Sequence, residues 1–205
     1  MSSQPLEAHS LAETYLYLMA THCPRCGQGP LRGADARPEG DERPIRLRIA
    51  ATCGSCGEHG EYRFTVPGSV ASLRARQAGS VAARVNPSSR PSQIIDVAQW
   101  IVLFRMIAEA ASRATDKVEA RRLGYEAAQC LEEALKFYEE GNDLPPDAAL
   151  FQESSREMRL TNPQEFSRER LMALRGRLPT LDLMEAERFV SRRSIRREWK
   201  FWRRK

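Results

Sequence analysis

Two cysteine pairs, each followed by a glycine, constrain this chain more than any other feature of its sequence. They read CPRCG at residues 23–27 and CGSCG at residues 53–57. Two thiolates separated by two residues can reach one metal ion from a tight turn, and the glycine that follows supplies the positive φ of that turn. Four thiolates in tetrahedral geometry suit zinc. We therefore expect one structural Zn²⁺, with these ligands: Cys23, Cys26, Cys53 and Cys56.

With these two pairs, residues 15–67 resemble zinc-ribbon proteins. The resemblance implies three short antiparallel strands clamped by two metal-binding turns. A unit this small buries too little apolar surface to fold alone, so the metal would supply folding free energy. Iron is the alternative metal, because a tetrahedral sulfur site accepts both. Rubredoxins, however, carry the CPxCG pair second, whereas it comes first here.

The same residue pattern argues against catalysis. Four thiolates leave zinc no open position for the water that a catalytic site needs. The three histidines, at positions 9, 22 and 59, all lie outside the region that we expect to be helical. Neither GxxxxGK[ST] nor GxGxxG after a strand occurs, so no motif supports nucleotide binding. We expect neither an enzyme nor a small-molecule substrate, and we expect His22 and His59 to lie beside the metal site without binding the metal.

Hydrophobic periodicity predicts an α+β chain, in which strands precede an α-helical domain. The resemblance implies that these strands form a small antiparallel zinc ribbon. Residues 46–52 and 61–66 alternate and are rich in β-branched or aromatic side chains, which is typical of strands. A shorter strand is expected near residues 30–32. Residues 11–20 fit either a helix or a strand.

Apolar residues at three- and four-residue spacing predict a helix from about residue 94 to 111 and a second helix that begins after Asp116. Asp116 is expected to cap the second helix with Glu119 as its capping-box partner, and residues 141–142 to end it. Asn162-Pro163 is expected to start a third helix, which Pro179 closes. We predict that these side chains are buried: Trp100, Phe104, Leu131 and Leu135.

Composition suggests four segments. Residues 1–67 would form the zinc ribbon, and residues 68–92, rich in Ser, Ala, Arg, Gly and Pro, a linker. Residues 93–187 would form the helical domain, and residues 188–205 a basic, aromatic tail. Cys130 is interpreted as a buried, unreactive thiol of the helical domain.

The net charge of +5 is concentrated at the C-terminal end, where residues 188–205 hold nine basic residues and one acid. Basic charge interleaved with aromatic rings suits a phosphate backbone and stacked bases. The candidate nucleic-acid-binding residues are Arg192, Arg193, Arg196, Arg197, Trp199, Lys200, Trp202, Arg203 and Arg204. A solvated or frayed terminus and, less favoured, a segment that binds a membrane or an acidic protein are the alternatives.

These patterns predict a non-enzymatic, zinc-binding protein that associates with nucleic acid through its tail. The alternative is a protein–protein adaptor that uses its helical domain, with a purely structural zinc. The N-terminus lacks a basic segment before an apolar stretch, so it does not read as a signal peptide. We therefore expect a cytoplasmic protein. In that reducing compartment, five cysteines favour metal binding over disulfides.

Overall fold

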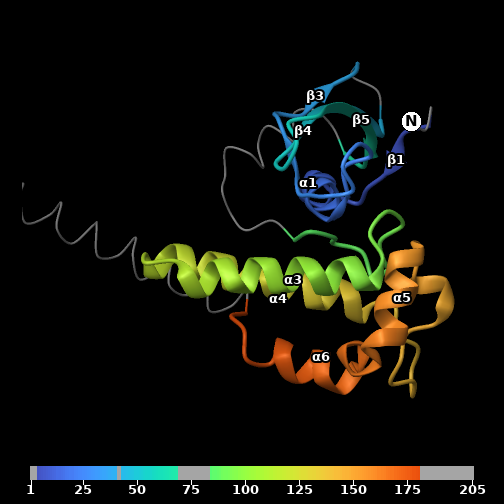
Figure 1. Ribbon diagram of the computed structural model, residues 1–205, viewed down its shortest axis with the longest axis vertical. Coiled ribbons are helices and arrows are strands. Elements are labelled where there is room, and N and C mark those ends of the chain that lie inside the picture. The colour runs from blue at the N-terminus through green and yellow to red at the C-terminus, as the bar shows by residue number, and fades with distance from the viewer. Residues whose placement is uncertain (1–3, 41–42, 69–83, 181–205) are drawn as a thin grey trace, which may run out of the picture.

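The computed structural model describes residues 4–40, 43–68 and 84–180, and these form a mixed α+β fold. The strands lie in the N-terminal half, and most of the helices follow them. Figure 1 shows the sheet and one short helix on one side of a long helical hairpin. The predicted fold class is therefore confirmed.

The sheet has five strands, ordered β1-β5-β4-β2, with β3 also paired to β4. Their bounds are β1 Leu6–Glu7, β2 Leu31–Gly33, β3 Arg37–Pro38, β4 Ile45–Cys53 and β5 His59–Val66. The two long strands and the short strand near residue 31 were predicted, and all three run antiparallel. Strand β1 was not predicted, and it pairs with β5 in parallel.

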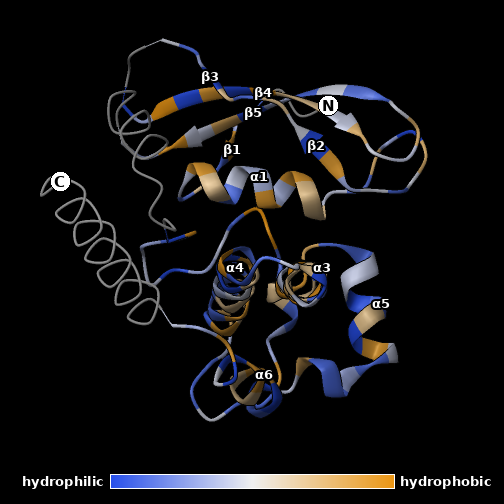
Figure 2. Ribbon diagram, turned by 90° about the vertical axis from the view of Figure 1, so that its left-hand side faces the viewer, coloured by the Kyte–Doolittle hydropathy of each residue, from blue (hydrophilic) through white to orange (hydrophobic). Residues whose placement is uncertain are grey.

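Residues 11–20, whose sequence fits either a helix or a strand, form helix α1 (Leu11–Ala20). Ser10 begins it, because its hydroxyl accepts the N–H of Glu13 at 3.1 Å. The helix packs under the sheet, with Leu18 fully buried. It also contacts the helical hairpin, so it forms a middle layer between the sheet and the longer helices (Figure 2).

The hairpin consists of α3 (Val97–Arg113) and α4 (Lys117–Leu135), which pack closely against each other. Asp116 caps α4 as predicted by accepting the N–H of Val118, but the side chain of Glu119 bonds Arg122 instead of completing a capping box. The helix also ends earlier than predicted. After Leu135 the backbone tightens into bonds of the i to i−3 type, which bring the buried hydroxyl of Tyr138 within 2.7 Å of the Phe166 carbonyl.

The expectation of one helix from Asn162 to Pro179 was also wrong. Residues Pro163–Phe166 form a 3₁₀ turn (η2), and α6 (Arg168–Arg175) starts afresh with Ser167 as its N-cap. The break arises because Asp143 accepts the Ser167 hydroxyl and the Glu169 N–H, which fixes a new helix start. Helix α5 (Glu153–Thr161) and the 3₁₀ turn η1 (Asp147–Ala149) were not predicted.

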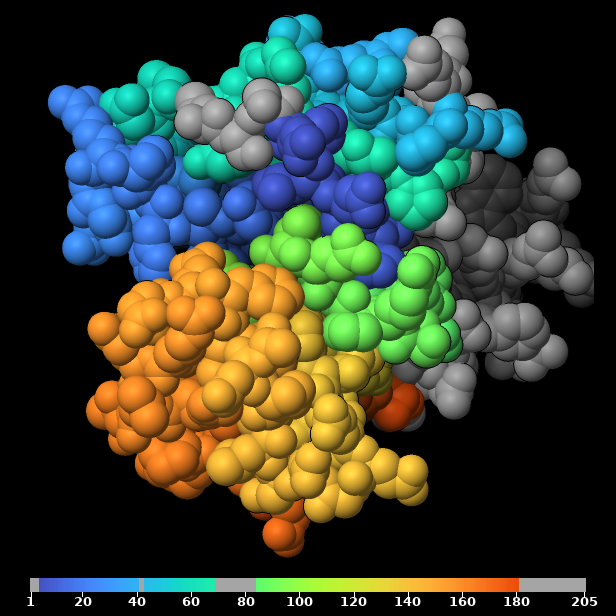
Figure 3. All heavy atoms as spheres, turned by 90° about the vertical axis from the view of Figure 1, so that its right-hand side faces the viewer, coloured from blue at the N-terminus to red at the C-terminus, as the bar shows by residue number. Residues whose placement is uncertain are grey.

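Residues 84–96 lie between the sheet layer and the hairpin, and Figure 3 shows part of this segment in green between the blue N-terminal part and the orange and yellow helices. Val85, in this segment, forms hydrogen bonds to both neighbouring parts. Its carbonyl accepts the hydroxyl of Ser10 from the start of α1, and its N–H donates to Gln129 of α4 at 2.8 Å. These bonds join the N-terminal part to the hairpin.

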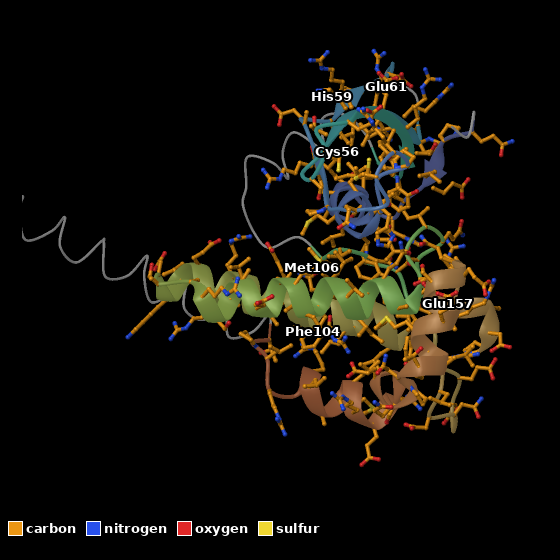
Figure 4. The ribbon with its side chains drawn as sticks, in the orientation of Figure 1. Cys56, His59, Glu61, Phe104, Met106 and Glu157 are labelled. Carbon is orange, nitrogen blue, oxygen red and sulfur yellow. The ribbon has the colours of Figure 1, made fainter. Side chains whose placement is uncertain are left out.

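The buried side chains of the sheet, α1 and the helices form one contiguous hydrophobic cluster. Trp100 and Leu131 are fully buried as predicted, whereas Phe104 and Leu135 are only partly buried. Phe104 projects from the side of α3 opposite to Met106 (Figure 4). Within the described ranges, no helix has the length and apolar character needed to cross a bilayer.

Candidate metal centre

Two similar turns carry the four cysteines. In the first turn the N–H of Gly27 donates to the Cys23 carbonyl at 2.9 Å, and in the second the N–H of Gly57 donates to the Cys53 carbonyl at 3.0 Å. Both glycines have positive φ, 67° and 73°, which other residues adopt only with strain. The predicted role of glycine after each pair is therefore confirmed.

The secondary structure brings the two turns together. The first turn follows the C-terminal end of α1, and the second lies at the end of β4, where Cys53 pairs with Leu31 of β2. The loop between them is held by two bonds. The N–H of Gly54 donates to the Pro30 carbonyl at 3.0 Å, and the hydroxyl of Ser55 donates to the Gly29 carbonyl at 3.1 Å.

The four sulfur atoms lie within 4.8 Å of one another. Cys23 Sγ is 3.7 Å from Cys56 Sγ, and Cys26 Sγ is 3.7 Å from Cys53 Sγ. A disulfide requires about 2.05 Å, so these are free thiols. A tetrahedron with metal–sulfur bonds of about 2.3 Å has sulfur–sulfur edges of about 3.8 Å. The side chains therefore fit a single tetrahedral metal ion.

The electrostatics of the four cysteine thiols also favour a bound cation. Backbone N–H groups of Cys56 and Ser55 favour the thiolate of Cys53 and lower its pKa to about 6. The pKa of Cys56 moves the other way, to about 12: the Glu58 backbone N–H favours its thiolate, but burial and the three neighbouring sulfurs outweigh that effect. Thiolates this close repel one another, so a bound cation is what allows all four to ionise.

The charged and histidine residues around the metal centre are not part of the cluster of four sulfurs. Arg25 Nη1 lies 2.9 Å from Glu58 Oε2 and thus joins the first turn to the second across an exposed surface. His22 is exposed. The Nδ1 atom of His59 lies 2.9 Å from the hydroxyl of Thr52, and Figure 4 shows His59 near the side of the sheet that faces away from the helices.

The other residues singled out in the sequence divide into two groups. Cys130 is fully buried on α4, and this burial raises the pKa of its thiol strongly, as expected for an unreactive cysteine. The candidate nucleic-acid-binding residues 192–204 lie outside the described residues, so their assignment remains a prediction.

Two buried carboxylates, which no sequence pattern predicted, lie on α1 and on α4. Glu13 is fully buried, and its Oε2 accepts the His9 N–H, whereas its Oε1 has no hydrogen-bond partner among the described residues. Glu133 accepts the Asn86 amide at 3.1 Å and the Lys136 ammonium at 2.7 Å. Burial raises the pKa of Glu133 to about 7, and the charge of Glu13 contributes in the same direction.

A shallow groove of about 320 Å³ lies between the end of α1 and the first metal-binding turn on one side, and α3 and α5 on the other. Its apolar walls include three methionines, Met19, Met106 and Met158, with Val102 exposed. Its described lining residues include no aspartate, glutamate, lysine or arginine. No single sequence pattern indicates this groove, because its walls come from four separate segments.

Comparison of the chain with protein-family models, with curated proteins and with solved structures finds no significant match.

Proposed function

We propose that this chain is a non-enzymatic, zinc-binding protein that associates with nucleic acid. The observation that carries the zinc assignment is the convergence of four cysteine sulfurs at tetrahedral spacing. All four ligand positions would be filled by thiolate, which is the pattern of a structural zinc and not of a catalytic one. The zinc-ribbon resemblance of the two CxxCG pairs supports the same choice of metal.

The role of the zinc would be to hold the sheet together at one end. Cys53 ends β4, and the first pair follows α1, so one ion would clamp a helix, a strand and the loop between them. Thiol ligands need a reducing environment, which is why we propose a cytoplasmic location.

The nucleic-acid part of the proposal rests on the basic, aromatic composition of residues 191–205. Arginine side chains there would contact phosphates, while Trp199 and Trp202 would stack on bases. Deletion of residues 191–205 removes eight basic residues and should weaken binding of labelled RNA and DNA oligonucleotides, with a smaller dependence of affinity on salt.

A second variant separates charge from stacking. Replacing Trp199 and Trp202 with alanine should weaken single-strand binding by about 1–3 kcal/mol per stacked base but leave the salt dependence almost unchanged. If the intact, zinc-loaded chain shows no salt-dependent binding to DNA or RNA, the nucleic-acid assignment is wrong. Sedimentation with anionic vesicles in that case would identify a lipid-binding tail.

The groove beside α3 favours the protein–protein adaptor as the second candidate function. Methionine-lined, uncharged walls suit an uncharged apolar segment of a partner protein, because methionine adapts its shape to varied ligands. Met106→Glu would place a charge in the groove and should abolish capture of such a partner. Glu109→Gln, an exposed change on the same helix, serves as the control. If neither variant changes partner capture, the groove is not the adaptor site.

A further inference from the structure

One face of the sheet is covered by α1, and no described element covers the other (Figure 2). Strand β4 alternates between the two faces along its whole length. Its apolar residues, among them Leu47 and Ile49, are buried toward α1, whereas Arg46 and Arg48 are exposed on the outer face. The outer face is therefore polar and open to a partner.

The strand register places three arginines in one row on this outer face. Arg48 of β4 lies directly opposite Arg37 of β3 and directly opposite Arg63 of β5. We call these three residues the arginine row. Paired residues on adjacent strands have Cβ atoms about 4.5–5.5 Å apart, and like charges directly opposite one another destabilise a sheet. Arg46, two residues before Arg48, adds a further positive charge to the same face.

Glutamates offset this charge only in part. Glu39 lies 3.5 Å from Arg48, and Glu61 lies 3.7 Å from Arg48 and 3.9 Å from Arg63. These are long contacts between side chains that are 31–55% exposed, so each contributes little to stability. With Arg32 opposite Thr52 and Glu7 opposite Thr65, the described residues of the outer face include five arginines and three glutamates.

A row of like charges costs stability, and Glu39 and Glu61 neutralise this row only in part. A local arrangement of this kind indicates a function, because packing alone does not require it. A guanidinium group binds a phosphate through two parallel hydrogen bonds, which makes arginine the preferred residue for a phosphate backbone. The row spans three strands, about 10 Å, and can contact two or three phosphates.

From this register we infer that the arginine row is a docking surface for the phosphate backbone of a nucleic acid. The inference rests on the proposed function and adds a second contact surface to the tail. The residues of β4 and β5 on this face are arginine, threonine, glutamate, alanine and one histidine, which lies at hydrogen-bond distance from Thr52, with no phenylalanine, tyrosine or tryptophan for base stacking. The contact is therefore to the backbone and independent of base sequence.

The test uses the full, zinc-loaded chain and two triple variants with the same change in net charge. Arg37→Gln/Arg48→Gln/Arg63→Gln removes the row. The control, Arg113→Gln/Arg122→Gln/Arg156→Gln, removes three exposed arginines of the helices that also have glutamate neighbours. Fluorescence anisotropy of a labelled 20-nucleotide RNA and a labelled 20-base-pair DNA, between 50 and 200 mM salt, measures binding.

Loss of the row should weaken binding at least tenfold at low salt and reduce the slope of log K against log salt by about 2, since each lost phosphate contact accounts for about 0.7–0.9. The control should change affinity less than threefold. The melting temperature of the row variant should stay the same or rise, because repulsion between neighbouring arginines is removed.

The remaining outcomes of this experiment would contradict either the docking surface or the proposed function. Equal weakening by both variants means that only net charge matters, and the docking surface is then wrong. Unchanged binding by the row variant, with binding lost on deletion of residues 191–205, assigns all contacts to the tail and overturns the inference while the proposed function stands. Absence of binding by the unmodified chain overturns the proposed function itself. Equally tight, row-dependent binding of polyglutamate overturns the choice of nucleic acid as the partner.

Discussion

One carboxylate oxygen of Asp96 accepts the backbone N–H of Phe151 at 3.0 Å, across 55 residues of sequence. The other oxygen accepts the N–H of Gln99 at 2.9 Å and so caps α3, and the Gln99 side chain accepts the Asp96 N–H in return. Asp96 is fully buried. A single side chain therefore fixes the start of α3 and the chain segment that leads into α5.

Replacing Asp96 with alanine should destabilise the protein more than loss of an ordinary helix cap. The change removes the cap of α3 and leaves the partly buried N–H groups of Phe151 and Gln152 without their acceptor, so we expect a cost of about 2–4 kcal/mol. Asp116→Ala is the matched control, because Asp116 caps α4 at an exposed position and should cost about 0.5–1 kcal/mol. Urea unfolding measures both, and equal costs would show that the Phe151 bond contributes nothing.

Removal of the metal should affect the helices as well as the sheet. Protein purified without chelator should contain one zinc per chain by elemental analysis, and Cys53→Ser or a strong chelator should release it. Because the buried residues of both parts form one cluster, we expect the helical circular-dichroism signal to melt at a lower temperature after zinc loss. Cys130→Ser serves as the control for metal content, since Cys130 lies on α4, away from the site. Iron in the purified protein would contradict the choice of metal.

The raised pKa of Glu133 predicts that the free energy of unfolding depends on pH. Its pKa is raised from 4.5 to about 7 in the folded protein, so the folded state holds this proton more tightly than the unfolded state. The contribution of Glu133 is therefore most favourable below about pH 4.5, declines as the pH rises toward 7, and is constant above that. The whole change is on the order of 3 kcal/mol.

The comparison between variants isolates this effect from acid release of the metal. Glu133→Gln should reduce the loss of stability between pH 5.5 and 7.5, as measured by urea unfolding at each pH, because glutamine stays neutral. Glu132→Gln, next in sequence and exposed, should retain the wild-type slope. If both variants follow the wild-type curve, Glu133 is already ionised in the folded protein throughout this range.

Gly33 of β2 lies in close contact with α1, so a substitution there tests how tightly the two elements pack. A Cβ atom at this position would lie 2.8 Å from Leu18 Cδ1 and 3.1 Å from both Ile49 Cγ2 and Tyr15 Cδ1. Gly33→Ala should therefore cost about 1–3 kcal/mol through overpacking. Gly176→Ala, where the nearest atoms are at ordinary contact distances, should be neutral or slightly stabilising. A neutral Gly33→Ala would show that α1 can move away from the sheet.

Local patterns predicted much of this structure, and distant contacts account for most of the rest. The two cysteine turns were predictable because the CxxCG pattern determines its own turn, and β4 because its alternation runs through nine residues. Strand β1 has only two residues and shows no periodicity. The link from α1 through Val85 to α4 depends on partners far apart in sequence, Ser10 with Val85 and Val85 with Gln129, so no local pattern reveals it.

The arginine row illustrates a further limit. The exposed positions of Arg46 and Arg48 follow from the alternation of β4, but the row needs the register with both neighbouring strands. A slip of either neighbouring strand by two residues gives other registers with the same alternation. Only the structure distinguishes them.

The position of α1 as a middle layer also has a consequence for the order of folding during synthesis. Protein synthesis adds about 5–20 residues per second, so the cysteines and strands emerge seconds before the hairpin. Until α3 and α4 are made, the face of α1 that will meet them, with Glu13 on it, stays in water. Metal capture can come first on the ribosome, whereas burial of Glu13 must wait for the hairpin.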